Sequence, residues 1–367
     1  MKGYPLITKS QARRNASIKH IQKAYQKQYR HIKGRFPKAR ISKVVALRSQ
    51  NSFYDLSNKQ IIKKAPEDLN IHLLLEEFKE KGICGLSGSG FQTDKKVKAV
   101  VDAKVKEKVL IINAVACDPG LIHDDWLIKH ELGKIEKGIA LLNKYIGFNR
   151  IILATKEKID SKDYEVCLVP NRYPMGAEKI LINHVLGKNF AFDEIPAMKG
   201  ILMLNVQTIY AIYEAIYEGI VANTRLITVA DLSTGEALVA RVNVGDKVID
   251  ILGQTLGKRP RLTPCFGEGI MMGRETTQED EITLTTNFIG YGEAISYNQE
   301  ARCRRCGACS RKCPMQIRVD KIIAAIEKNN LSIIKELHPE NCIQCGACTY
   351  HCKAGKNTMA LVEELKS

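Results

Sequence analysis

The centre of the chain alternates short apolar runs with longer amphipathic segments. Residues 109–113 and 150–155 are predicted to be buried strands, and residues 123–145 between them have helical spacing. Residues 200–218 begin as a strand and continue as an amphipathic helix. Because strands alternate with helices, this part of the chain is expected to form an α/β layer with a parallel sheet.

Three further patterns flank this centre. Residues 9–34 have apolar positions at roughly helical spacing and predict a basic amphipathic helix, which is followed by an irregular stretch to about residue 66. Residues 225–252 contain alternating stretches and predict a small β-rich module of ubiquitin-like type. Residues 317–337 predict two helices.

A glycine-rich loop, GLSGSGF at residues 85–91, follows a predicted short helix at residues 69–82. A Lys-rich segment of helical character comes next. Many such loops are simple turns. The position of this loop, close to a strand end and a helix start, favours anion binding, because backbone N–H groups can point at a phosphate there.

The end of the chain carries two runs of the form Cys-x2-Cys-x2-Cys-x3-Cys. Their members are Cys303, Cys306, Cys309, Cys313, Cys342, Cys345, Cys348 and Cys352. This spacing is typical of two [4Fe–4S] clusters in which the fourth Cys of each run ligates the other cluster. We therefore expect Cys352 to complete the first cluster and Cys313 the second. Zinc and disulfides are the alternatives; zinc favours pairs of Cys-x2-Cys, and disulfides do not suit a reducing compartment.

Composition is that of an ordinary soluble protein: 367 residues, 45% hydrophobic and 26% charged. No apolar run has the length of a membrane span, and the first residues lack the apolar core of a secretion signal. Together with cysteines kept for metal, this predicts a cytoplasmic location, with membrane association only through a complex.

The net charge of +16 is concentrated at the start of the chain, since residues 1–54 hold fourteen Lys or Arg and no acidic residue. Such an arm could bind nucleic acid, an anionic membrane surface or an acidic protein, or could be a transit segment. For an iron–sulfur protein we favour docking to an acidic redox partner. A basic helix that is merely solvated is the alternative, and nucleic acid is disfavoured because no known nucleic-acid module accompanies the arm.

Several sequence blocks resemble the RnfC family, the C subunits of Rnf electron-transport complexes, and its soluble relatives, such as the electron-transfer protein associated with proline reductase. The blocks are GICGLSGSGFQTDKK, NAVACDPG followed by Asp124 and Asp125, YPMGAEKILI, LNVQTIYAIYEA, IMMGR and the two Cys runs. They occur in the family's order from about residue 75 to 360. The resemblance implies a domain similar to the flavin subunit of respiratory complex I, which holds FMN and takes hydride from NADH.

Carried over residue by residue, the resemblance implies an FMN site. Its residues are Gly85, Gly88, Gly90, Phe91, Thr93, Lys96, Asn113, Glu178, Asn205 and Thr208. The implied organisation is a basic arm at 1–66, a Rossmann-like flavin domain at 67–200, an SLBB-like β module at 201–285 and a helical dicluster domain at 286–367.

The chain departs from the family pattern beside the expected nicotinamide site. Ala116 and Asp118 stand where the family has two Glu residues, and Trp126 replaces a basic residue. Ser87 and Gln92 replace a glycine and a proline of the phosphate loop. We therefore expect FMN to bind weakly and NADH oxidation to be slow or absent, and no catalytic residue is assigned.

The sequence as a whole predicts an electron-transfer flavo-iron–sulfur protein. Electrons, with NADH as one candidate donor, are expected to pass through FMN and two [4Fe–4S] clusters to a partner reductase. The alternative is a non-catalytic Fe–S adaptor subunit of a larger redox complex, with a degenerate flavin and NADH site.

Overall fold

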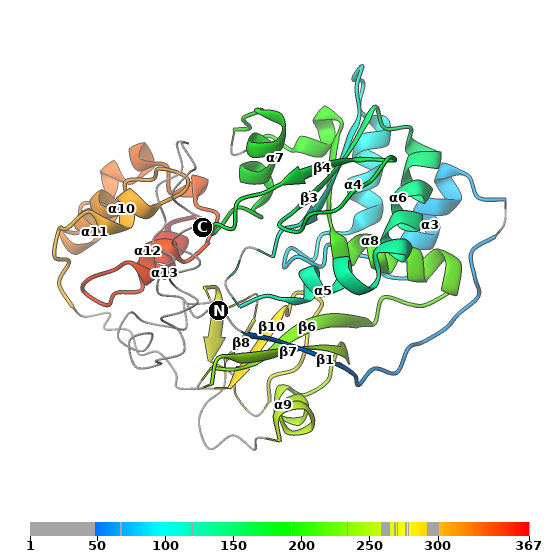
Figure 1. Ribbon diagram of the computed structural model, residues 1–367. Helices are drawn as coiled ribbons and strands as arrows, with labels where there is room; N and C mark the ends of the chain where they lie inside the picture. The colour runs from blue at the N-terminus through cyan, green and yellow to red at the C-terminus, as the bar shows by residue number, and fades with distance from the viewer. Residues whose placement is uncertain are drawn as a thin grey trace.

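The structure, a computed structural model, describes residues 48–366 except for 67, 117, 119, 192, 233, 258–264, 268, 270, 276, 278 and 292–300. The helix predicted at 9–34 and most of the basic arm lie outside these residues. Two sheets with their helices and a lobe of short helices make up the described chain (Figure 1). Within this part, no helix has both the length and the apolar character needed to cross a bilayer.

The first sheet is parallel and has the strand order β4-β3-β2-β5. Its strands are β2 (Val109–Ala114), β3 (Arg150–Thr155), β4 (Glu165–Leu168) and β5 (Ile201–Asn205). Every residue of β2 is buried, as expected for a central strand covered on both faces. The predicted parallel α/β layer is confirmed, and β4 is a strand that the prediction did not contain.

Helices cover both faces of the parallel sheet (Figure 1). They are α3 (Ile71–Glu80), α4 (Thr93–Asp102), α5 (His123–His130), α6 (Leu132–Ile146), α7 (Glu178–Leu186) and α8 (Val206–Tyr213). On one face, α3, α4, α6 and α8 share a core with Leu110 and Leu204. On the other face, α7 shares a core with Ile111 and Met203. Successive strand residues therefore enter different cores.

The helical stretch predicted at residues 123–145 is confirmed, and the structure divides it into two helices. Glu131, with φ −126° and ψ 19°, separates α5 from α6. Trp126 of α5 stacks on Phe53 with ring centroids 4.5 Å apart. The break allows α5 to contact the second sheet while α6 packs along α8.

The second sheet has the order β1-β7-β6-β10-β8-β9. Its strands are β1 (Arg48–Asp55), β6 (Thr224–Asp231), β7 (Glu236–Asn243), β8 (Cys265–Gly267), β9 (Gly273–Glu275) and β10 (Phe288–Tyr291). Together with α9 (Val248–Leu256), β6, β7 and β10 enclose a core of their own. The irregular stretch predicted up to residue 66 is wrong at β1, which pairs in parallel with the distant β7.

A buried ion pair joins the second sheet to the end of α8. Arg241 of β7 donates to both carboxylate oxygens of Glu214, at 2.7 and 2.6 Å, and to the hydroxyl of Thr224. Glu214 begins a π-helical turn, Glu214–Glu218, directly after α8. A bidentate pair with a further hydrogen bond gives the buried charges the partners that they need.

The cysteine runs lie in a lobe of short helices, seen at the left of Figure 1. The helices are α10 (Ala308–Lys312), α11 (Val319–Glu327), α12 (Ala347–Tyr350) and α13 (Thr358–Glu363). The two helices predicted at 317–337 are wrong in part, since α11 is followed only by 3-10 turns at Leu331–Ile333 and Lys335–Leu337. Asn329, with φ 52°, leaves the helical region directly after α11.

Candidate cofactor site

The glycine-rich loop closes on itself at the start of α4. The N–H of Gly85 donates to the carbonyl of Phe91 (2.8 Å), and the N–H of Gly90 donates back to the carbonyl of Gly85 (3.0 Å). Gly88 and Gly90 have φ of 109° and 61°, which side chains disfavour. The glycines are therefore required by the turn itself.

The loop offers donors to an anion. Among the described residues, no acceptor is bonded to the backbone N–H groups of Ser87, Gly88 and Ser89. The buried hydroxyl of Thr93, the first residue of α4, also has no hydrogen-bond partner in this part of the chain. Free amides beside a helix N-terminus suit a phosphate, so the loop fits the group that the sequence predicts for it.

Two side chains hold the loop from behind. The N–H of Leu86 donates to the hydroxyl of Thr208 (3.0 Å), and Arg225 donates to the carbonyl of Leu86 (3.0 Å). Thr208 is fully buried and does not line the cleft described below. Its place is therefore behind the loop. Arg225 was not predicted, because only tertiary structure brings β6 to this loop.

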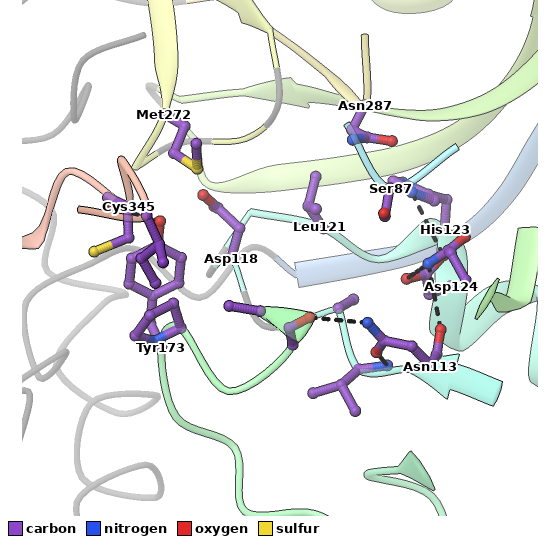
Figure 2. A pocket seen from close by; sticks show the side chains of 17 residues that line it. Ser87, Asn113, Asp118, Leu121, His123, Asp124, Tyr173, Met272, Asn287 and Cys345 are labelled. Atoms are coloured by element: carbon purple, nitrogen blue, oxygen red, sulfur yellow. Dashed lines mark hydrogen bonds and ion pairs between the residues drawn. The ribbon is translucent and has the colours of Figure 1, made fainter. Parts of the chain in front are cut away.

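A cleft opens at the carboxyl ends of β2 and β5, where the strand order reverses (Figure 2). Parallel sheets bind ligands at such switch points. Asn113 and Asn205 lie opposite each other in the register, and both line the cleft. The space between its walls is about 690 Å³, including the part open to solvent. Other wall residues come from the glycine-rich loop, the second sheet and the dicluster lobe: Ser87, Met272, Asn287, Ile343 and Cys345.

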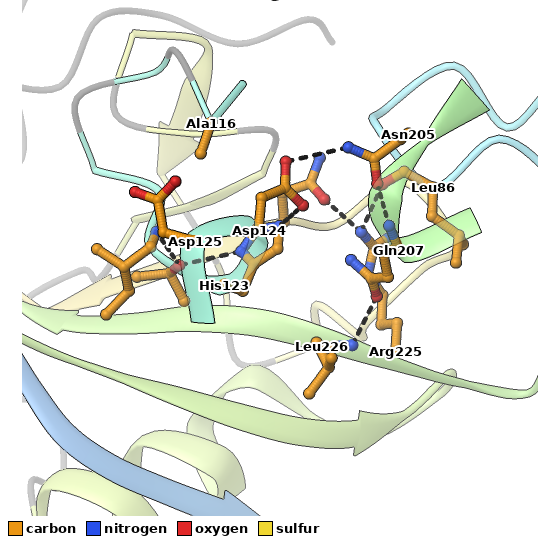
Figure 3. Close-up of polar contacts among 12 residues, drawn as sticks. Leu86, Ala116, His123, Asp124, Asp125, Asn205, Gln207, Arg225 and Leu226 are labelled. Carbon is orange, nitrogen blue, oxygen red and sulfur yellow. Dashed lines mark hydrogen bonds and ion pairs between the residues drawn. The ribbon is translucent and has the colours of Figure 1, made fainter. Parts of the chain in front are cut away.

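His123 and Asp124 form a buried polar pair at the cleft wall (Figure 3). Asp124 Oδ2 accepts a hydrogen bond from Asn205 Nδ2 (3.0 Å). Asp124 Oδ1 lies 3.7 Å from His123 Nε2 and has no hydrogen-bond partner among the described residues. Burial raises the pKa of Asp124 to about 7 and lowers the pKa of His123 to about 3. His123 is therefore neutral, and Asp124 titrates near neutral pH.

The segment after β2 holds the substituted acidic positions. Ala116 lines the cleft, and its carbonyl accepts a hydrogen bond from Lys156 Nζ (2.8 Å). Asp118 also lines the cleft, but its Oδ1 accepts from the N–H of Gly120 (3.2 Å) and its Oδ2 from the N–H of Met271 (2.9 Å). Asp118 thus ties this segment to the loop between β8 and β9, which restrains its carboxylate.

Of the ten predicted flavin residues, only Asn113 and Asn205 line the cleft. Lys96 of α4 forms an ion pair with Glu178, the first residue of α7, at 2.7 Å. Neither residue lines the cleft. Phe91 is 54% exposed at the end of the glycine-rich loop. The wall instead contains Tyr173 and Met272, for which the only sequence signal was their place within the blocks YPMGAEKILI and IMMGR.

Both cysteine runs begin with the same backbone turn. Arg305 and Gln344, at equivalent positions, have φ of 49° and 57°. Their N–H groups donate to the sulfur atoms of Cys303 (3.4 Å) and Cys342 (3.3 Å). The repeated spacing therefore produces a repeated local structure.

Cys313 of the first run lies among the thiols of the second run. Burial raises the pKa of Cys345 well above its ordinary value, and repulsion from Cys348, Cys313 and Cys342 raises it further. Burial raises the pKa of Cys348 to about 12. Without a cofactor these groups are thiols, which lose their protons on binding iron. This grouping fits the crossed ligation expected from the spacing.

The described residues contain no group of three or more His, Cys, Asp or Glu side chains that could hold one metal ion. A cubane makes a different demand, because each of its thiolates binds a separate iron atom.

The dicluster lobe also reaches the cleft. Tyr173 Oη donates to the carbonyl of Cys345 over 2.5 Å, and both residues line the cleft. Ile343 lines it as well and packs against the α7 side of the parallel sheet. The second cysteine run and the switch-point asparagines therefore belong to one site.

Two family models match the chain. The Nuo51 FMN-binding domain matches residues 78–214, and a 4Fe-4S dicluster domain matches residues 295–353. The first match contains the glycine-rich loop and both switch-point asparagines, and the second contains all eight cysteines of the two runs. The chain is therefore a protein that joins an FMN-binding domain to a 4Fe–4S dicluster domain.

Curated relatives of the chain are C subunits of ion-translocating complexes. The chain is 28% identical to the C subunit of the ion-translocating oxidoreductase complex of Haemophilus influenzae, over 70% of this chain and 34% of that protein. The protein of the same name from Buchnera aphidicola is 26% identical, over 80% and 64%. The C subunit of the proton-translocating ferredoxin:NAD(+) oxidoreductase complex of Clostridium ljungdahlii is 27% identical, over 68% and 58%. The predicted resemblance to the RnfC family is confirmed, and the chain spans less than two thirds of each of these relatives.

Solved structures share the fold. An NAD+-reducing [NiFe]-hydrogenase in the H2-reduced state has a TM-score of 0.58 at 15% identity, over 86% of this chain and 66% of that chain. The air-oxidized state of such a hydrogenase gives 0.55 at 16% identity, over 81% and 61%. At these identities the likeness concerns the fold alone.

Proposed function

We propose that the chain is an electron-transfer subunit in which FMN, held in the cleft, and two [4Fe–4S] clusters relay electrons to or from a partner reductase. The observation that carries this proposal is that Cys345, a proposed cluster ligand, lines the same cleft as Asn113 and Asn205. A flavin exchanges electrons in pairs or singly, and a [4Fe–4S] cluster exchanges them singly.

Residues of the cleft and of the neighbouring glycine-rich loop would hold different parts of the flavin. The free amides of Ser87, Gly88 and Ser89 would hold its phosphate, and Asn113 and Asn205 would meet its ring at the strand ends. Lys96 would add positive charge near the loop once it leaves Glu178, and Thr208 positions the loop from behind.

The spacing and the position of Cys313 support two proposed sets of cluster ligands. One set is Cys303, Cys306, Cys309 and Cys352; the other is Cys342, Cys345, Cys348 and Cys313. The domain organisation proposed with it has the basic arm at 1–66, the flavin domain at 67–200, the β module at 201–285 and the dicluster domain at 286–367, except that β5 and α8 go with the flavin domain and β10 goes with the β module. The β module, with β6, β7, α9 and β10 around one core, is proposed to be SLBB-like.

NADH is not proposed as an efficient donor. The cleft wall carries Ala116 where the family has a carboxylate, and Asp118 is bonded to two backbone N–H groups. We propose instead that the chain serves within a larger redox complex, as the names of its relatives suggest for them, with any membrane association made through that complex. The competing adaptor function would leave the cleft without flavin.

Anaerobic purification of the full chain tests the proposal. We expect about eight iron and eight sulfide per chain, from two cubanes, and release of FMN on acid extraction. Clusters without FMN, even after incubation with FMN, would support the adaptor instead. Mixing with NADH should bleach flavin and clusters slowly or not at all, and the Ala116→Glu variant should bleach faster if the missing carboxylate is the cause.

A further inference from the structure

The two cysteine runs share a backbone turn but face different surroundings. Ile343 and Gln344 stand between the first two cysteines of the second run, and Ile343 packs against the flavin domain and lines the cleft. Arg304 and Arg305 occupy the same places in the first run, and both are exposed. The same turn therefore points into the molecule in one run and out of it in the other.

The two cysteine runs also differ in charge. Residues 302–313 contain five Arg or Lys and no acidic residue, whereas residues 342–352 contain no Lys, Arg, Asp or Glu. We call the exposed residues Arg302, Arg304 and Arg305 the arginine rim. Among the described residues, none forms an ion pair with the arginine rim.

The carboxylates near the first run are already engaged. Glu327 accepts a hydrogen bond from the N–H of Cys303 (2.9 Å) and lies 3.6 Å from Lys356 Nζ. Asp320 pairs with Arg318 at 3.1 Å and accepts a hydrogen bond from Ser310. These contacts hold the cysteine turn in place and leave the positive charge of the rim available to a partner.

We propose that the arginine rim docks an acidic one-electron carrier protein and that electrons enter or leave the chain at the first-run cluster. The inference rests on the proposed function, because docking there is useful only if a cluster lies beneath the rim. The thiols of Cys345 and Cys348 are buried, with Cys345 beside the cleft, whereas those of Cys303 and Cys306 are half-buried beneath exposed arginines. A carrier with an acidic face would be steered to the rim by its charge.

The test uses the full, cluster-loaded chain and an acidic two-cluster ferredoxin as the probe. Arg304→Glu/Arg305→Glu reverses the rim. Lys104→Glu/Lys106→Glu is the matched control, because both lysines are exposed and precede β2, at the opposite end of the sheet from the cleft. Binding of the oxidised proteins is measured by titration calorimetry, so that no electron transfer is needed, and association is followed by stopped flow over a range of salt concentrations.

We expect the rim variant to associate roughly tenfold more slowly, or worse, at low ionic strength, to bind more weakly and to lose most of its salt dependence. The control should behave as the wild type, and iron content should be equal in all three proteins. Arg304→Gln/Arg305→Gln, which removes the charges without reversing them, should give a smaller loss in the same direction.

Unchanged affinity in the rim variant, or an equal loss in the lysine control, would overturn the docking proposal. A different result would refute the flavin proposal, namely a chain that holds both clusters but no FMN. Ferredoxin binding to the arginine rim could still be measured on such a chain, so the two proposals are tested separately.

Discussion

Replacing Tyr173 with Phe should loosen the contact between the cleft and the second cysteine run. Tyr173 Oη donates to the carbonyl of Cys345 over 2.5 Å, and both residues are buried. Phe keeps the aromatic ring and its packing but removes this donor. The carbonyl of Cys345 then lacks the hydrogen bond that joins it to the cleft wall.

The size of the effect follows from burial. A buried acceptor left without its donor costs about 1–3 kcal/mol. Because about 1.4 kcal/mol corresponds to a tenfold change in an equilibrium constant, local opening of residues 342–348 should become roughly 5 to 150 times more frequent. Because opening exposes Cys345, oxygen should also destroy the second-run cluster of the Tyr173→Phe variant sooner than its first-run cluster.

Hydrogen exchange measured by mass spectrometry on the anaerobic, cluster-loaded chain gives the opening of residues 342–348 directly. Tyr350→Phe is the matched control. Tyr350 is also buried, but its hydroxyl has no hydrogen-bond partner among the described residues, so its removal leaves no partner unsatisfied. We expect faster exchange in Tyr173→Phe and wild-type exchange in Tyr350→Phe.

Equal protection of residues 342–348 in Tyr173→Phe and wild type would refute the reasoning, and so would equal acceleration in both variants. The first result would mean that the Tyr173 hydrogen bond contributes nothing to holding the turn. Equal acceleration in both variants would mean that packing of the aromatic rings, not the hydrogen bond, sets the stability of the turn at residues 342–348.

Two further predictions concern titration and cluster ligation. The native pKa of Asp124 is about 7, above its unfolded value, so its contribution to stability is full at low pH and declines as pH rises to about 7. The free energy of unfolding of Asp124→Asn should therefore rise by about 2 kcal/mol relative to that of wild type between pH 5.5 and 7. Anaerobic thermal unfolding at several pH values measures this, and a difference between the two proteins that does not change with pH would contradict it. Cys352→Ala should lose the first-run cluster and Cys313→Ala the second, leaving about four iron in each and different EPR signals, whereas loss within the mutated run alone would exclude crossed ligation.

Local sequence patterns determined much of this protein. The apolar runs at β2, β3 and β5 predicted the parallel sheet, because strands covered on both faces are mostly apolar. The two cysteine runs predicted the dicluster domain from spacing alone, and the comparison with known domains agrees. The sequence also places Asn113 and Asn205 at or next to the ends of two such strands, and the pairing of β2 with β5 sets them opposite each other.

Tertiary structure decided what no local pattern contains. β1 is a strand only because β7 offers it hydrogen bonds from far along the chain, and Arg225 reaches the glycine-rich loop only because the second sheet packs there. Thr208 lies behind that loop, although the resemblance suggested a contact with flavin.

The two cysteine runs have the same spacing and share the segment Cys-Gly-Ala-Cys, but the chain by itself does not say which run lies beside the cleft. Packing against the flavin domain places Cys345 at the cleft and leaves Arg304 and Arg305 exposed around the first run. The sequence predicts the cluster ligands, because the prediction depends on the cysteine spacing within each run. Which cluster faces the flavin and which faces a partner depends on contacts between segments far apart in the chain, and these exist only in the folded protein.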